Sequence, residues 1–204
     1  MLFEETDQLL EPGYTPLETG YYRLPNGQMH VAVLTRMPYC KWKMIDWWFG
    51  HLDGTKKYKM WHPKSHLALE WDEHWWPGQY IGASRIVEKE MNGVVMKYRI
   101  LFHEPTDFFN ISKFDNKNTI TAICANVYDL DKVSLGRIIH FMRDTDFGCE
   151  MRSRFWLYKS HENEAMYVMQ HCIEKMGNLA DFLPELYRRE IEDKGPVVVG
   201  DHLT

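Results

Sequence analysis

The stretch IGASRIVEKEMNGVVMKYRILF, residues 81–102, decides the fold. Residues 81–91 and 94–102 are two runs rich in β-branched and aromatic side chains, and Asn92-Gly93 separates them. An Asn-Gly pair accepts the positive φ angles that a tight hairpin turn requires. This stretch therefore predicts an antiparallel β-hairpin.

The segments on both sides of the hairpin extend the pattern. Further strands are expected over residues 20–23, 29–35, 119–128, 136–143 and 150–158, with turns at 24–27 and 144–148. Ser160 is the predicted N-cap of a long helix, because Glu162 and Glu164 suit the positive end of a helix dipole. We expect that helix to reach Leu183, where Pro184 ends or kinks it. Antiparallel strands followed by one long helix predict an α+β domain.

The remaining segments are less regular. We expect a short helix over residues 3–10, a second helical piece over 185–193 and a frayed tail from about 195. Residues 40–49 suit either a helix or the start of a strand. Residues 50–78 are predicted to be a long loop rich in Trp, His and Pro, and loops of that length are often functional. The chain is predicted to be one domain, 1–204, with a short extension at about 1–12.

Composition narrows the class of protein. The chain has 204 residues and a net charge of −5, which argues against a general nucleic-acid binder. No apolar stretch approaches the roughly 18–20 residues of a membrane helix, and the acidic N-terminus lacks the pattern of a secretory signal. The four cysteines are widely spaced and form no CxxC pair, so a disulfide scaffold is not expected. We expect a cytoplasmic protein that binds neither membranes nor nucleic acid.

Several histidines and carboxylates could carry chemistry, although each has a plainer interpretation. His62 and His66 would share a helix face at a metal-like spacing, or they form a solvated pair in a loop. His140 lies on an apolar strand face, where it needs a metal or, more commonly, a hydrogen-bond partner. Glu90 ends a strand, a position where carboxylates are usually solvated.

The predicted C-terminal helix carries two more candidates. Its apolar stripe is expected to contain Met169, Cys172, Ile173, Met176, Ala180 and Leu183. His171 lies at the edge of this stripe, and Glu174 lies further round, where periodicity favours exposure. On a preceding strand, Arg152 and Arg154 share a face with Glu150, which predicts either an ion-pair ladder or an anion clamp.

Five stretches of this sequence resemble one known family. They are residues 11–14 (EPGY), 44–49 (MIDWWF), 58–63 (YKMWHP), 150–155 (EMRSRF) and 171–187. Over about residues 11–190 the chain resembles the 2,4-diacetylphloroglucinol hydrolases and the related phloretin hydrolases. The Trp-Trp-Phe and Trp-His-Pro elements, in that order, are the most specific part of the resemblance.

The resemblance implies a helix-grip (START-like) fold, in which a curved antiparallel sheet closes on a long C-terminal helix. It also implies one divalent metal ion, usually zinc, held by two His and two Glu. Carried onto this sequence, the implied ligands are His62, Glu90, His140 and Glu174. The sequence departs from the family at Lys175, which stands where a carboxylate is expected.

The implied reaction is hydrolysis of the carbon–carbon bond between an aromatic ring and an acyl group. The metal would polarise the acyl carbonyl and activate water, and His66 or His171 would protonate the ring carbon as general acid. Tyr58, Trp61 and Phe155 would line a flat pocket for a small-molecule phenolic ketone with ortho hydroxyl groups.

An alternative is a non-catalytic protein that binds flat apolar ligands, or shapes polyketides, in the same cavity without metal. Lys175 is the sequence feature that favours this alternative. Fold alone does not separate the two hypotheses, and a homodimer is left open.

Overall fold

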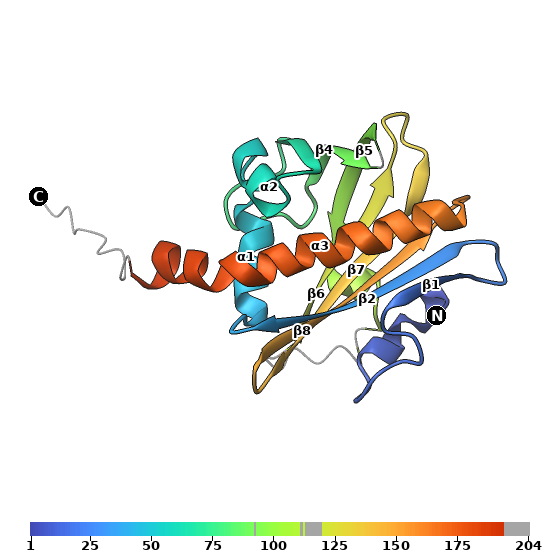
Figure 1. Ribbon diagram of the computed structural model, residues 1–204, viewed down its shortest axis with the longest axis horizontal. Helices are drawn as coiled ribbons and strands as arrows, with labels where there is room; N and C mark the ends of the chain where they lie inside the picture. The colour runs from blue at the N-terminus through green and yellow to red at the C-terminus, as the bar shows by residue number, and fades with distance from the viewer. Residues whose placement is uncertain (92, 111, 113–119, 194–204) are drawn as a thin grey trace, which may run out of the picture.

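The computed structural model describes residues 1–91, 93–110, 112 and 120–193. Within these ranges the chain forms one eight-stranded antiparallel sheet with a long helix across one face (Figure 1). The strands are β1 (Gly20–Arg23), β2 (Met29–Pro38), β3 (His66–Trp71), β4 (Ser84–Met91), β5 (Val94–His103), β6 (Ile120–Tyr128), β7 (Ser134–Thr145) and β8 (Gly148–Leu157). Their order across the sheet is β1-β2-β8-β7-β6-β5-β4-β3. The predicted α+β architecture is confirmed.

The hairpin predicted from residues 81–102 is present as β4 and β5. Met91 pairs with Val94 at the closed end of the hairpin. Gly93 has a φ of 76°, a left-handed conformation that glycine adopts without strain. Asn92, the other predicted turn residue, lies outside the described residues.

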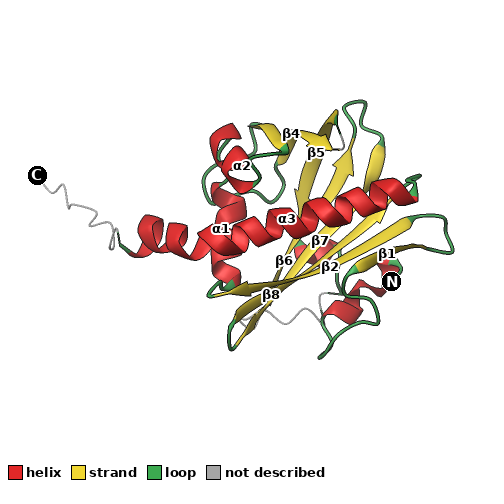
Figure 2. Cartoon of the chain, viewed as in Figure 1, coloured by secondary structure: helices red, strands yellow, loops and turns green. Residues whose placement is uncertain are grey.

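The helices of the described part of the chain are α1 (Trp42–His51), α2 (Thr55–Trp61) and α3 (Glu162–Tyr187). Shorter 3-10 turns occur at η1 (Phe3–Leu9) and η2 (Pro105–Asp107), and a π-helical turn, η3 (Arg188–Glu192), follows α3. Figure 2 shows α1 and α2 at one end of the sheet, next to α3. The segment that suited either a helix or a strand is therefore a helix. None of the described helices is both long and apolar enough to cross a membrane.

The prediction of one long loop over residues 50–78 is wrong, because α2 and β3 lie within it. β3 pairs with β4, with Leu69 opposite Val87, so a distant strand supplies its hydrogen bonds. α2 is docked on α3 by the Trp61 indole, whose Nε1–H donates to the Lys175 carbonyl at 2.9 Å. Both elements depend on tertiary partners that local sequence does not reveal.

Helix α3 continues past Pro184, which was expected to end or kink it. Pro184 lies inside the helix and cannot donate to the carbonyl of Ala180, four residues earlier. The Cys40 thiol lies 3.9 Å from that oxygen and supplies a weak donor in place of the missing N–H. The N-cap is His161, one residue later than predicted. Most of the predicted helical piece over 185–193 belongs to α3 and η3, and the predicted tail lies outside the described residues.

The core has a part on each face of the sheet. Under α3 the buried side chains include Trp48, Phe49, Met151, Cys172, Met176, Leu179 and Leu183. On the opposite face η1 covers a smaller cluster with Leu9, Phe108 and Trp156. The α3 stripe differs from the predicted one at Ile173, which is 43% exposed, while Leu179 is buried.

Two buried arginines of β8 form ion pairs beneath the N-terminal segment. Arg152 and Arg154 each donate to the Glu18 carboxylate at 2.7 Å. Glu150 instead accepts from Arg143, at 3.1 Å. The predicted ladder with Glu150 is thus replaced by a network around Glu18, which satisfies two otherwise costly buried charges.

Candidate active site

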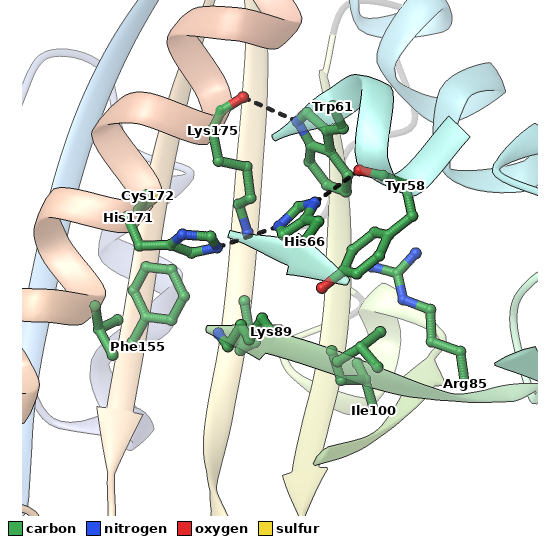
Figure 3. Close-up of a pocket in the computed structure, with 13 residues that line it drawn as sticks. Tyr58, Trp61, His66, Arg85, Lys89, Ile100, Phe155, His171, Cys172 and Lys175 are labelled. Atoms are coloured by element: carbon green, nitrogen blue, oxygen red, sulfur yellow. Dashed lines mark hydrogen bonds between the residues drawn. The ribbon is translucent and has the colours of Figure 1, made fainter. Parts of the chain in front are cut away.

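Two hollows meet at helix α3. The inner pocket, between α2, α3 and the sheet, has a polar lining of Tyr58, His66, Arg85, Lys89, His171 and Lys175 (Figure 3). The outer hollow is lined by His62, Lys64, Ser65, Glu90, Met91, Tyr167, Gln170, His171 and Glu174. His171 lines both, so this side chain separates an open hollow from a pocket inside the fold.

His66 and His171 form a hydrogen-bonded imidazole pair in the inner pocket. The Nδ1 atom of His66, at the start of β3, lies 2.9 Å from the Tyr58 carbonyl oxygen. A carbonyl only accepts, so Nδ1 carries the proton and Nε2 is the acceptor in the neutral ring. His66 Nε2 lies 3.3 Å from His171 Nε2, which must therefore be the donor. The second nitrogen of neutral His171, Nδ1, is then its basic nitrogen.

Burial and nearby cations keep both imidazoles neutral. Burial lowers the pKa of His66 to about 2, and Lys175 adds to this effect. For His171 burial is again the largest cause of a lowered pKa, followed by Lys89 and Lys175. At neutral pH both rings of the resting pair are therefore neutral, and neither is an imidazolium.

Three cationic side chains line the same pocket. Arg85 and Lys89 project from β4, and Lys175 projects from α3. Figure 3 shows the Lys175 amine beside the imidazole pair. Burial lowers the pKa of Lys175 to about 8, and burial together with Lys175 lowers the pKa of Lys89 to about 7. Both amines thus exchange protons in the range where most enzymes work.

Three of the four predicted metal ligands lie at the outer hollow. His62 Nδ1 accepts from the Ser65 backbone N–H at 3.1 Å, so its Nε2–H donates to Glu174, also at 3.1 Å. The Glu90 carboxylate accepts from the Gly93 backbone N–H at 2.6 Å and holds the hairpin turn. His62 and Glu174 are thus in contact, whereas Glu90 has a structural partner.

His140, the fourth predicted ligand, lies elsewhere. It is buried on β7, and its Nδ1 lies 2.8 Å from the Ser153 hydroxyl, opposite it on β8. Its ring packs near Phe49 and Phe155, and burial lowers its pKa well below the usual value. The plainer expectation, a core histidine with a hydrogen-bond partner, describes it.

These residues do not fit the four-ligand zinc site. His62 contacts Glu174, but the Glu90 carboxylate is bound to the Gly93 N–H and His140 is bound to Ser153 in the core, so the four side chains do not converge on one point. Among the described residues no three His, Cys, Asp or Glu side chains are grouped to hold a metal ion. The imidazole pair is accompanied by two lysines, whose charge opposes a divalent cation. The zinc requirement stays a prediction.

The structure places the predicted ring-binding residues Tyr58, Trp61 and Phe155 in the inner pocket, together with both predicted catalytic histidines. Arg85 and Lys89 were missed as site residues, and Lys175 was noted only as a departure from the family's ligand pattern. One signal pointed to the first two, because strand alternation places Arg85, Val87 and Lys89 on one face of β4. The sequence alone did not show that this face points into a pocket.

Solved structures support the fold. Ginseng major latex-like protein 151 from Panax ginseng aligns with a TM-score of 0.50 at 10% identity, covering 76% of this chain and 96% of that one. Ara h 8.0201 aligns with a TM-score of 0.52 at 10% identity, covering 78% of this chain and 99% of that one. The helix-grip, START-like fold is confirmed.

A family model shows the family, and two sequence relatives agree with it. A protein from Pseudomonas sp named 2,4-diacetylphloroglucinol hydrolase is 22% identical over 91% of this chain and 76% of its own length. A second protein of that name, from Pseudomonas protegens, is 22% identical over 91% of this chain and 72% of its own. Residues 1–166 match the model of the DAPG hydrolase PhiG domain. The chain therefore belongs to the DAPG hydrolase PhiG domain family.

Proposed function

We propose that the protein is a hydrolase that cleaves the carbon–carbon bond between a polyphenol ring and an acyl group. The observation that supports this most is the neutral His66–His171 pair, which lies where the open outer hollow meets an aromatic pocket. Two curated relatives named 2,4-diacetylphloroglucinol hydrolase support an acylated phloroglucinol as the substrate class.

The reaction needs a base next to water and a pocket for the ring. Water enters from the outer hollow and adds to the acyl carbonyl, and His171 Nδ1 accepts the proton that the water loses. Tyr58, Trp61 and Phe155 hold the ring. The cationic groups of Lys89 and Lys175 stabilise the oxyanion that forms on the carbonyl.

Collapse of the oxyanion breaks the bond between the ring and the acyl carbon. The electron pair goes to the ring carbon, which ortho hydroxyl groups make tolerable by allowing a keto form. The imidazolium formed in the first step then returns its proton to that carbon. The products are a carboxylic acid and the deacylated polyphenol, so the atoms of one water molecule account for both new bonds.

The test is a hydrolysis assay across acylphloroglucinols, with both products measured. We expect the wild-type chain to release the acid and the ring in equal amounts, and His171→Asn to release far less. His74→Gln, at an exposed histidine, is the matched control. Full activity in His171→Asn would contradict the assigned role.

A second candidate is a non-catalytic carrier of flat aromatic ligands. The observation that favours it is the lysine pair in the inner pocket, because the predicted four-ligand metal site is not assembled there. Tight binding of an acylphloroglucinol without any product would support the carrier over the enzyme. The cytoplasmic location and a homodimer stay predictions.

A further inference from the structure

The inner pocket has an excess of positive charge. Arg85, Lys89 and Lys175 line it from two different elements, and no Asp or Glu is among the described residues that line it. Cations that share one pocket repel one another, and burial strengthens the repulsion. A cluster of this kind is stabilised when an anion enters it.

Arg85 gives independent evidence for such a ligand. The residue is only 5% exposed. Its Nε and Nη1 atoms are buried and have no hydrogen-bond partner among the described residues. Buried donors without acceptors destabilise a protein, so each such group in a native fold calls for a partner such as a water, an ion or a ligand.

Aromatic rings hold the Arg85 guanidinium without satisfying those donors. Its central carbon lies 4.9 Å from the ring centroid of Phe102 and 5.4 Å from that of Trp71. A ring face attracts the charge, but it offers no lone pair to N–H groups at the edge of the guanidinium. The rings therefore fix the position of Arg85 and leave its Nε and Nη1 donors without an acceptor.

The rest of the lining selects the shape of the anion. The apolar part of the lining is both aromatic and aliphatic. Trp61 and Phe155 supply ring faces, and the aliphatic side chains are those of Val87, Ile100, Ile138 and Val168. A small hydrated ion such as phosphate gains nothing from these walls, whereas a flat ring buries apolar area against them. The chemistry of the lining suits a ligand with an aromatic body and one negatively charged oxygen at its edge. The free volume of the pocket is about 50 Å³, so the pocket must widen when a ring enters.

We propose that the inner pocket binds planar aromatic oxyanions, with the charged oxygen at Arg85, Lys89 and Lys175 and the ring against the aromatic wall. The proposal deepens and rests on the function above, for which it means that the polyphenol binds as its phenolate. An aromatic carboxylate also combines a flat ring with a negatively charged oxygen. The experiment therefore compares a phenolate with a carboxylate.

The experiment uses the full chain and matched pairs of small probes, measured by titration calorimetry. Benzoate is compared with benzamide, and para-nitrophenolate with its neutral methyl ether; inorganic phosphate is the probe without a ring. We expect each anion to bind at least about tenfold more tightly than its neutral partner, in line with a charge-assisted hydrogen bond in a buried site. Equal affinities within both pairs, or phosphate binding as tightly as benzoate, would overturn the proposal.

The two anions identify the source of the charge. Preference for the nitrophenolate over benzoate supports a phenolate ligand, and the reverse order supports a carboxylate; the first result is the one expected here. In addition, para-nitrophenol mixed with excess protein slightly below its pKa in water should gain visible phenolate absorbance. An unchanged spectrum despite binding would contradict stabilisation of the phenolate.

Variants locate the site. Arg85→Met and Lys175→Met should each weaken anion binding about tenfold with little effect on the neutral probes, whereas Lys175→Arg retains the charge and most of the affinity. Lys64→Met, at the outer hollow, is the matched control. If a Met variant does not fold, the wild-type probe pairs still decide the matter. Anion binding without hydrolysis would refute the proposed function alone, and hydrolysis without anion preference would refute this inference alone.

Discussion

The Nε2 atoms of His66 and His171 lie 3.3 Å apart, joined by a hydrogen bond whose direction the Tyr58 carbonyl determines. That carbonyl holds the proton of His66 on Nδ1, so His171 donates from Nε2 and keeps Nδ1 basic. The Tyr58 carbonyl, which belongs to α2, thereby determines which nitrogen atoms of His66 and His171 carry protons. The two imidazoles in turn connect β3 to α3.

The first prediction concerns this pair. His171→Asn removes the base and should lower kcat by about a hundred- to ten-thousand-fold with a smaller change in KM, since the ring-binding walls remain. His66→Asn should lower kcat less, because His66 acts by positioning His171. Steady-state kinetics on an acylphloroglucinol measure both, and a larger loss in His66→Asn than in His171→Asn would contradict this order of roles.

A second prediction concerns metal. Lys175→Glu places a carboxylate beside the His66–His171 pair and removes a repelling charge, so the variant should gain zinc affinity over the wild-type chain. Lys175→Gln removes the charge without adding a ligand and is the control. Zinc content after dialysis is the measurement. One tightly held zinc per wild-type chain, lost in His62→Ala and His140→Ala, would instead support the predicted four-ligand site.

The Glu18 network predicts a dependence of stability on pH. Burial opposes ionisation of Glu18, but hydrogen bonds from Arg152 and Arg154 outweigh it and lower the pKa from 4.5 to about 2. Because the folded pKa is the lower one, the stabilisation is fully present above the unfolded value and is lost as the pH falls towards about 2.

Glu18→Gln should therefore lower the free energy of unfolding near neutral pH by about 3–5 kcal/mol, since two buried arginines lose their counter-charge. It should also reduce the loss of stability between about pH 5 and about pH 3. Urea denaturation at several pH values tests this, with the exposed Glu70→Gln as control. A variant whose stability falls as steeply with acid as the wild type does would refute the assignment.

Packing of α3 on the sheet predicts a contrast within one helix. Leu183→Ala removes a fully buried side chain and should destabilise the fold by about 2–5 kcal/mol. Ile173→Ala, on the exposed side of the same helix, should change stability by no more than about 0.5 kcal/mol. Chemical denaturation measures both, and similar losses in the two variants would mean that α3 is not packed as described.

Much of this fold could be predicted because its signals are local. The Asn-Gly turn and the alternating runs on both sides of it predict the β4–β5 hairpin without any knowledge of its neighbours. By contrast, β3 exists because β4 offers it an edge. Pro184 is tolerated because the freed carbonyl of Ala180 has a thiol nearby. Neither partner is adjacent in sequence.

The predictions of the site divide in the same way, into those that residue type supports and those that need the tertiary fold. His66, His171 and the aromatic wall could be predicted as candidates from residue type, and they meet in one pocket. The role of His140 depended on Ser153, which lies opposite it only once β7 and β8 pair. Arg85 and Lys89 were missed because a charged residue on a strand is usually solvated, and only the tertiary fold shows that Arg85 is buried.

The most direct test of the central claim is hydrolysis of an acylphloroglucinol in water enriched in heavy oxygen, followed by mass spectrometry of both products. The account predicts one heavy oxygen in the released carboxylic acid, an unlabelled polyphenol ring, and loss of both products in His171→Asn. Recovery of the intact ketone after prolonged incubation with folded wild-type protein, or release of an acid without the label, would contradict it.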